Sequence, residues 1–311
     1  MLQSAGITNK ITLCGRKAWR SRYLLLMMAF PFVYLILFCY VPLYGAQIAF
    51  REYNPFRGIW GSEWVGLVHF QNFFQSIYFG RLLRNTLVIS ITQLIFTFPL
   101  PIIVAIMINE VSNRYAKRTI QTVIYLPHFI SVVVIVGLVF AVLSPHNGII
   151  NRLIVLAGGE RIFFFNEPQY FPFIIALAEV WQNTGWGTIV YLAAITAIDP
   201  TLYEAAVVDG ASRFKQILRI TIPAILPTIV VLFILRIGGL FTVGYQKILL
   251  LYNPTIYETA DIIQTFVYRR GIAGMEYSFG TAVDLFNSVC NLIMLLVFNK
   301  IMRRVSETSL W

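Results

Sequence analysis

Residues 199–223 read DPTLYEAAVVDGASRFKQILRITIP and lie between two long apolar runs. Asp199 followed by Pro200 is a helix-start signal, and Glu204-Ala205-Ala206 continues with good helix formers. Gly210 can supply the turn that ends one short helix and begins another. The stretch therefore predicts a compact helix, turn and helix lying across a membrane surface, either as an ordinary amphipathic connector or as a docking element.

The composition of the chain indicates that the lipid bilayer is its solvent. Hydrophobic residues make up 58% of the 311 residues and charged residues only 12%, a balance that soluble domains of this length do not normally show. The formal net charge is +10, but the basic residues separate apolar runs and do not form one patch. The composition thus argues against a soluble enzyme and gives no indication of nucleic-acid binding.

Six stretches are long and apolar enough to cross a hydrocarbon core about 30 Å thick, which needs about 20 helical residues. They are residues 23–44, 83–109, 119–143, 172–198, 223–245 and 278–299. The first is of full length and no small-residue cleavage site follows it, so we expect an anchor and not a signal peptide. The predicted fold class is an all-α integral membrane protein with six transmembrane helices.

Lysine and arginine residues set the predicted orientation. The tail before residue 23 carries Lys10, Arg16, Lys17, Arg20 and Arg22, and basic residues also follow the second and the last stretch. We expect these segments, and therefore both termini, on the cytoplasmic side. Residues 1–22 and 303–311 are then cytoplasmic tails, residues 23–302 form the six-span domain, and the segments 47–82, 144–171 and 246–277 face outward.

The spacing within residues 199–223 matches a known motif. Glu-Ala-Ala is followed by three residues, Gly, nine residues and Ile-x-hydrophobic-Pro, which resembles the EAA loop of permease subunits in binding-protein-dependent ABC importers, with Ile222 where Leu is usual. The stretches YVPLYGAQIAF, GSEWVGLVHF, NTLVIS, LPHFIS and WGTIVYLAAITAIDP extend the resemblance over nearly the whole chain. They are similar to LplB-like, polysaccharide-importing carbohydrate permeases, which are related to the maltose permeases.

The resemblance implies a function and a set of partners. The loop is implied to be a coupling helix that sits in a groove of a cytoplasmic ATPase. Its coupling residues are then Glu204, Ala205, Ala206, Asp209, Gly210, Ala211, Phe214 and Pro223. The implied assembly adds a second, similar permease, an ATPase dimer that uses ATP and Mg, and an extracytoplasmic solute-binding protein. It lies in the cytoplasmic (inner) membrane of a prokaryote, in contact with lipid, and imports an oligosaccharide or polysaccharide fragment.

Two spans carry polar side chains that are candidates for the solute path. Glu179, Gln182, Asn183 and Trp186 share one face of the fourth span, and Asp284, Asn287, Ser288 and Asn291 share one face of the sixth; Tyr245 ends the fifth. Burying amides and charges in hydrocarbon is costly, so these faces are expected to meet a cavity, a partner or another helix. Amides beside an aromatic ring suit a sugar, which favours the cavity for the fourth span and leaves both readings open for the sixth.

Two residues depart from the pattern of the related permeases. Asp284 stands where the relatives usually carry Gly, and Gln246 stands where an acidic residue is common. Asp284 is expected either to bind substrate or to pair with Arg236 of the fifth span. Neither departure touches the 199–223 loop, so both bear on the identity of the solute and not on coupling.

The sequence predicts no catalytic residue, no metal site and no cofactor bound by this chain. It lacks the G-x-x-x-x-G-K-[ST] phosphate loop, so we do not expect it to hydrolyse ATP. His69, His128 and His146 show no metal spacing, and His128 beside Pro127 is expected to pack or to accompany a kink. Two alternatives are a permease for a non-sugar solute and a membrane enzyme such as a glycosyltransferase, although no clustered catalytic set supports the enzyme.

Overall fold

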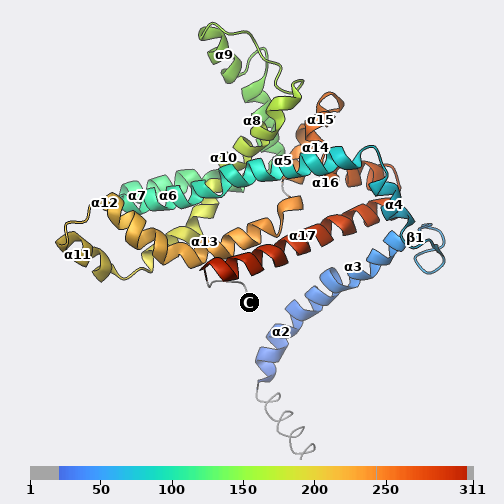
Figure 1. The fold of residues 1–311 in the computed structure, drawn as a ribbon, viewed down its shortest axis with the longest axis horizontal. Helices are drawn as coiled ribbons and strands as arrows, with labels where there is room; N and C mark the ends of the chain where they lie inside the picture. Colours follow the sequence, from blue (N-terminus) through green and yellow to red (C-terminus); the bar gives the residue numbers. More distant parts are fainter. Residues whose placement is uncertain (1–20, 243, 307–311) are drawn as a thin grey trace, which may run out of the picture. The chain divides into compact units, whose positions relative to one another are not determined.

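The computed structural model describes residues 21–242 and 244–306 of the chain. The chain divides into two compact units, Met1–Leu67 and Val68–Trp311, which are described separately (Figure 1). Of the two tails predicted from the sequence, residues 1–20 and 307–311 lie outside the described residues.

The first unit is a nearly continuous helix followed by a small hairpin. Its helical elements are α2 (Arg22–Leu35), a π-helical turn (Ile36–Tyr40), α3 (Val41–Leu43) and a 3-10 helix (Tyr44–Phe50). Strands β1 (Arg51–Glu52) and β2 (Glu63–Trp64) pair antiparallel, with Arg51 opposite Trp64. The helix agrees with the first predicted span and continues six residues past it, whereas the hairpin was not part of the all-α prediction.

The second unit holds the other described helices, with α10 at its centre. These helices are α4 (Val68–Phe74), α5 (Phe79–Thr97), α6 (Pro99–Glu110), α7 (Arg114–Tyr125), α8 (Val132–Leu143), α9 (Ile149–Leu156), α10 (Phe171–Thr196), α11 (Pro200–Val208), α12 (Arg213–Gln216), α13 (Ile222–Ile237), α14 (Tyr245–Leu251), α15 (Tyr257–Ala260), α16 (Ile263–Val267) and α17 (Tyr277–Ser306). Short 3-10 or π segments join several of them, at Leu126–Phe129, Pro168–Tyr170, Ile217–Thr221, Leu240–Thr242, Pro254–Ile256 and Tyr268–Ala273. Helix α10 packs against α5, α6, α7 and α13, so it contacts most of the bundle.

Apolar side chains form three clusters in this unit. One joins α5, α8, α10 and α14 around Phe171, a second joins α4, α5, α16 and α17 around Phe73, and a third joins α6, α10 and α13 around Ile225. Helix α10 approaches α7 closely at Gly185, where a Cβ atom would lie 1.9 Å from the carbonyl oxygen of Ile124. Any larger residue at Gly185 would therefore force α7 and α10 apart.

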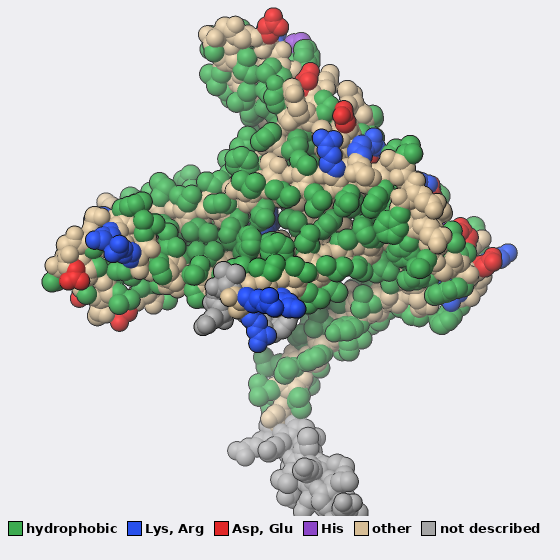
Figure 2. Space-filling view, in the orientation of Figure 1, with side chains coloured by type: hydrophobic (Ala, Val, Ile, Leu, Met, Phe, Trp, Pro, Cys, Tyr) green, Lys and Arg blue, Asp and Glu red, His purple; other side chains and the backbone are tan. Residues whose placement is uncertain are grey.

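The outer surfaces of the long helices are apolar, as the composition predicts. Within the described residues, four helices are long and apolar enough to cross a membrane: Arg22–Phe50, Phe79–Glu110, Arg213–Ile237 and Tyr277–Arg304. The described residues hold up to six spans when two bent pairs are counted as one span each. No more than 22% of the most apolar stretch of each long helix is buried. In Figure 2 hydrophobic side chains cover the middle of the second unit, over α5, α13 and α17, and charged ones gather near the helix ends. A hydrocarbon environment accounts for this pattern.

The third predicted span, residues 119–143, is wrong as a single helix. Its two parts, Arg114–Phe129 and Val132–Leu143, meet at an angle of 100°. Pro127 lies in a 3-10 turn just before the bend, Ile130 is extended, and the Ser131 hydroxyl accepts a hydrogen bond from the Val134 N–H to start α8. The kink expected near His128 is therefore present, but it is a sharp corner.

The fifth predicted span, residues 223–245, is also displaced. The apolar helix runs over Arg213–Ile237, and Tyr245 is instead the first residue of α14. Between α13 and α14 lie a 3-10 turn, Leu240–Thr242, and Gly244 with φ of 71°. Apolarity continues through this break, which is why the sequence alone placed the helix end about eight residues too late.

Candidate functional site

The polar face predicted for the fourth span lies on α10 and lines a cavity. Because Glu179, Gln182 and Asn183 recur at helical spacing, they share this face. The cavity has a volume of about 400 Å³, and its lining residues are His128, Val132, Glu179, Gln182, Asn183, Thr242, Gly244, Tyr245, Gln246 and Lys247. The α7–α8 corner, α10 and the start of α14 therefore form one polar chamber.

Glu179 is the charged centre of this chamber. It is in an ion pair with the Lys247 ammonium group, and the two side chains are only 13% and 6% exposed. The Arg236 guanidinium lies 4.0 Å from the other Glu179 oxygen and donates a hydrogen bond to the Thr97 hydroxyl at 3.3 Å. A single carboxylate thus faces two cations.

His128 and Asn183 extend the network from Glu179 toward Trp186. The Asn183 amide N–H donates to Glu179 Oε1 at 2.7 Å, which leaves Asn183 Oδ1 as an acceptor for His128 Nδ1 at 2.8 Å. His128 Nδ1 therefore carries the proton. The imidazole also stacks on Trp186, with ring centroids 4.5 Å apart and planes inclined by 5°. The packing role predicted for His128 is present, and it positions two residues of the candidate path.

A second cavity lies on the other side of Glu179 and Asn183. Its volume is about 430 Å³, and its lining residues are Thr97, Phe98, Pro101, Glu179, Asn183, Trp186, Gly187, Val190, Tyr191, Leu232 and Arg236. Glu179 and Asn183 line both cavities. The polar face of α10 therefore borders two adjoining spaces, one toward α14 and one toward α5, α6 and α13.

Gln182 has a structural contact as well as a place in the lining. Its amide N–H donates a 2.9 Å hydrogen bond to the carbonyl oxygen of Ile130, at the corner where α7 gives way to α8. A helix break leaves backbone carbonyls without intrahelical partners, and burying them unpaired is costly. Gln182 thus stabilises the corner that shapes the first cavity.

The candidate residues of α17 do not line either cavity. Asn291 Oδ1 accepts a 2.9 Å hydrogen bond from the Phe241 N–H and so braces the break after α13. Asn287 is 1% exposed, and among the described residues its amide atoms have no hydrogen-bond partner. Asp284 is exposed, and Arg236 contacts Glu179 instead, so the proposed Asp284–Arg236 pair is absent from the described part. A place for Asp284, Asn287 and Asn291 on the solute path stays a prediction.

The 199–223 loop forms two short helices joined at Gly210, as predicted. Asp199 caps α11 by accepting a 2.9 Å hydrogen bond from the Thr201 N–H, which lowers the pKa of the Asp199 carboxyl below its ordinary value. At the other end, the Ala211 N–H donates to Ala206 and the Gly210 N–H to Val207, with Gly210 at φ of 70°. This pairing is a Schellman motif, which glycine permits without strain.

The candidate coupling residues lie on an exposed surface. Glu204, Ala205, Asp209, Gly210, Phe214 and Pro223 are exposed, and Ala206 and Ala211 are half-buried. The Phe214 side chain is 71% exposed, and Leu202, Val207 and Val208 are also exposed apolar residues of the loop. The Tyr203 and Thr221 hydroxyls are 2.9 Å apart, and Arg213 pairs with Glu110 of α6 at 3.1 Å. The loop is thus anchored to two long helices and presents apolar side chains outward.

Comparison with known proteins decides the family of the chain. Residues 97–307 match the family described as binding-protein-dependent transport system inner membrane component. This range includes the face of α10 that lines the two cavities and the 199–223 loop. The chain belongs to this family of transport permeases. It is therefore a transporter subunit and not an enzyme.

Relatives and solved structures of the permease cover nearly its full length. YteP of Bacillus subtilis (strain 168), a polygalacturonan/rhamnogalacturonan transport system permease protein, is 44% identical over 95% of this chain and 92% of YteP. Protein LplB of the same organism is 42% identical over 94% of this chain and 92% of LplB. The permease is also similar to a chain in a crystal structure of a bacterial ABC transporter involved in import of the acidic polysaccharide alginate, with a TM-score of 0.86 and 42% identity over 94% of this chain and 98% of that one.

A second crystal structure gives the same result. It shows a bacterial alginate ABC transporter in complex with an alginate pentasaccharide-bound periplasmic protein, and its matching chain has a TM-score of 0.87 and 42% identity over 95% of the permease and 99% of that chain. The predicted importer-permease fold is thereby confirmed. Among residues 21–242 and 244–306, no group of three His, Cys, Asp or Glu side chains is placed to hold a metal ion.

The sequence did not identify Lys247 as part of the site. It lies in segment 246–277, which was assigned to the outward face, yet it is buried against Glu179 of α10. Two features of the sequence could have indicated the pair. Lys247 is a lone lysine close after an apolar run, and Glu179 is a lone acidic residue within another span. Pairing of intramembrane charges is the general expectation, but the partner could not be chosen without the break that turns α14 back into the permease.

Proposed function

We propose that the permease forms half of the translocation path of an ATP-driven importer of an oligosaccharide or polysaccharide fragment. Its partners are a second permease subunit, a cytoplasmic ATPase dimer that uses ATP and Mg, and an extracytoplasmic solute-binding protein. The polygalacturonan/rhamnogalacturonan of YteP and the alginate of the structurally similar transporter support a polysaccharide cargo. The placement of basic residues supports a bacterial inner-membrane protein with both termini in the cytoplasm.

The continuity of α10 with the coupling loop carries this proposal. One helix lines both cavities with Glu179 and Asn183 and then bends by 69° into α11. Packed helices move as rigid bodies, so displacement of α11 by a partner is expected to move the cavity wall. Glu204, Asp209 and Phe214 then contact the ATPase, with the apolar residues around them filling its groove.

The chemistry of the two cavities suits an acidic saccharide. Asn183, Gln182 and Gln246 can pair with sugar hydroxyls, and Tyr245 and Trp186 offer ring faces to the apolar faces of sugars. Lys247 and Arg236 outnumber Glu179, so the lining carries one more positive than negative group. A uronate carboxylate can replace Glu179 as the anionic partner of Lys247 or Arg236. A neutral sugar has no anionic group that could do so.

Reconstitution in liposomes tests the proposal. The complete transporter with its binding protein should take up an alginate oligosaccharide only when ATP is present, and a neutral maltooligosaccharide should enter far more slowly. The isolated permease should transport neither. Uptake by the permease alone, or equal uptake of a peptide or amino acid by the complete system, would contradict the proposal.

Within the same assay, Trp186→Ala tests the path itself. Loss of the ring that stacks on His128 should weaken uptake while the subunits still co-purify, because Trp186 is half exposed at the cavity wall. Phe173→Ala is the matched control, since it removes an exposed aromatic residue of α10 that lines neither cavity. If the two changes lower uptake equally, Trp186 has only a packing role and does not contribute to the solute path.

A further inference from the structure

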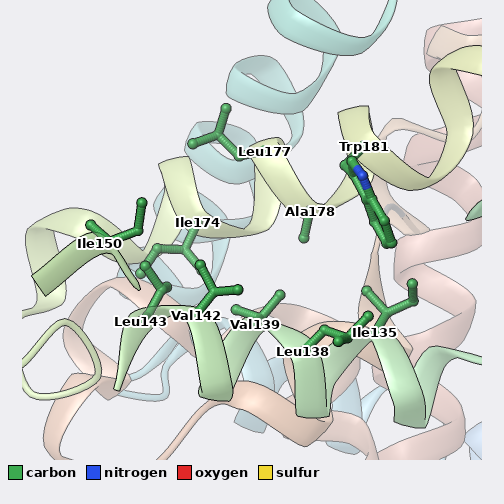
Figure 3. A pocket seen from close by; sticks show the side chains of 10 residues that line it. All are labelled: Ile135, Leu138, Val139, Val142, Leu143, Ile150, Ile174, Leu177, Ala178 and Trp181. Atoms are coloured by element: carbon green, nitrogen blue, oxygen red, sulfur yellow. The ribbon is translucent and has the colours of Figure 1, made fainter. Parts of the chain in front are cut away.

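The face of α10 opposite the solute path borders an apolar groove. Ile174, Leu177, Ala178 and Trp181 line it from α10, on the side of the helix away from Glu179 and Asn183. Residues of α8 and α9 complete a cavity of about 470 Å³, with Ile150 and Leu143 at one end and Trp181 and Ile135 at the other (Figure 3). Every lining side chain is hydrophobic.

A basic pocket lies at the connection between α8 and α9, close along the chain to Leu143 and Ile150 of the groove. Its volume is about 270 Å³, and its lining includes His146, Arg152 and Arg161 but no acidic residue. Both arginines are exposed, and no described acidic side chain forms an ion pair with either. The lining of this pocket is therefore basic, without an acidic residue in it.

Buried hydrogen bonds hold the corner between the two spaces in place. Asn151 is 2% exposed, and its amide donates to the carbonyl oxygens of Leu143, Ser144 and Ile162. Asn151 Oδ1 also accepts from the Ile162 N–H at 2.8 Å. Since Leu143 lines the groove and Asn151 lines the basic pocket, one side chain fixes their relative position. The two spaces are thus preformed and need no ordering on binding.

We propose that the groove and the basic pocket together bind one anionic phospholipid, with an acyl chain along α8 and α10 and the phosphate at Arg152 and Arg161. From Ile135 to Leu143 the groove follows about 12 Å of helix, which gives an acyl chain a continuous apolar wall. Acyl chains suit a lining without polar groups, and arginine is the side chain that best matches a phosphate.

The position of the groove favours lipid over the second permease subunit as its occupant. This step rests on the proposed function, because a path shared by two permeases lies on the side of α10 that carries Glu179 and Asn183. The groove lies on the opposite side of the same helix. A protein partner there would also have to cover Arg152 and Arg161, which a lipid phosphate neutralises directly.

Photolabelling of the assembled transporter in nanodiscs tests the site. Phosphatidylglycerol with a diazirine on its acyl chain is compared with phosphatidylcholine carrying the same group, in a phosphatidylcholine bilayer, and labelled residues are mapped by mass spectrometry. Phosphatidylglycerol should label Leu138, Val142 and Trp181 at least about fivefold more strongly. Arg152→Gln and Arg161→Gln should each lower that labelling about fivefold, while Arg57→Gln, at an exposed arginine of the hairpin, should not.

A steric variant provides a second readout. Ala178→Phe should fill the groove and abolish labelling, whereas Ile293→Phe on the exposed face of α17 should leave it unchanged. If Ala178→Phe does not assemble, the labelling map of the wild type and the labelling of the two arginine variants still test the proposed lipid site. Equal labelling by both lipids, or a groove labelled in the isolated permease but protected in the complete transporter, would overturn the proposal. Labelling needs neither ATP nor cargo, so failure of transport and failure of lipid binding are separable.

Discussion

The 199–223 loop, which contains α11 and α12, and the break between α13 and α14 both interrupt long helices, but they are stabilised differently. The loop is closed by hydrogen bonds among its own residues, through the Asp199 side-chain cap and the Gly210 Schellman turn. The break is held by other helices: Ser90 of α5 donates to the Leu240 carbonyl, and Asn291 of α17 accepts from the Phe241 N–H. A locally closed, exposed element can move as a unit, whereas a buried break cross-linked to two helices is suited to form a fixed cavity wall.

The largest expected effect is at the buried end of the break. Lys247→Met leaves the Glu179 carboxylate with the Asn183 amide and the more distant Arg236, because α14 no longer supplies its close cationic partner. Removing one member of a buried ion pair costs about 3–5 kcal/mol, so the melting temperature of the permease in detergent should fall sharply. Adding Glu179→Gln to Lys247→Met should restore much of the loss. No change in melting temperature would mean that water solvates the Glu179–Lys247 pair and that this part of the cavity wall is not rigid.

The next effect falls on the loop and should separate stability from coupling. Gly210→Val forces a β-branched residue to φ of 70°, a strain of about 1–3 kcal/mol, although no atom lies within 4 Å of the new Cβ. The protein should reach the membrane but lose ATPase co-purification and substrate-stimulated ATP hydrolysis. Gly210→Asn, which tolerates this backbone conformation, should retain both.

A strain control makes the Gly210 result specific. Gly58 has φ of 66° and equally open surroundings in the hairpin of the first unit. Gly58→Val therefore introduces the same backbone strain outside the coupling loop and should leave stimulation by substrate intact. If Gly58→Val uncouples the ATPase as strongly as Gly210→Val, the effect is general destabilisation and the loop has no special role.

The contrast also explains what the sequence could and could not predict. The caps and turn of the loop depend on residues a few positions apart, so Asp199, Pro200 and Gly210 were sufficient to place α11 and its end. The end of α13 depends on Ser90 and Asn291, which are about 150 and 50 residues away along the chain. Without those contacts, a continuous apolar run reads as a continuous helix.

The same distinction between local and long-range contacts applies to the residues of the candidate site. The spacing on α10 correctly grouped Glu179, Gln182 and Asn183, because one helix carries all of them. It could not place Lys247, which reaches Glu179 only after the chain has turned at the break. For α17, spacing placed Asn287 and Asn291 on one face but could not show that Asn291 accepts a hydrogen bond from the Phe241 backbone. Periodicity identifies a face, and tertiary contacts decide what it meets.

Asn291→Ala sharpens the comparison by releasing one of the cross-links at the break. The Phe241 N–H then loses its acceptor in a buried setting, which should destabilise the permease by about 1–2 kcal/mol. Thermal unfolding measures the change, with Ser288→Ala, on an exposed part of the same helix, as the matched control. A result within error of Ser288→Ala would show that the break closes locally, like the loop.

The smallest effect on stability is expected at the pair that ties the loop to α6. Arg213 and Glu110 are 3.1 Å apart, with 75% and 38% of their side chains exposed. Exposed ion pairs contribute about 0–1 kcal/mol, so Glu110→Gln should barely change thermal unfolding, and Glu276→Gln, in the similarly exposed pair with Arg270, should behave alike. The two variants should differ in transport, because only the Glu110 pair fixes the loop on a long helix. Lower ATP-coupled uptake for Glu110→Gln alone, restored by exchanging the two charges as Glu110→Arg with Arg213→Glu, would identify a contact that transmits movement without stabilising the fold. Equal uptake by both variants would confine coupling to α10, α11 and the Tyr203–Thr221 contact.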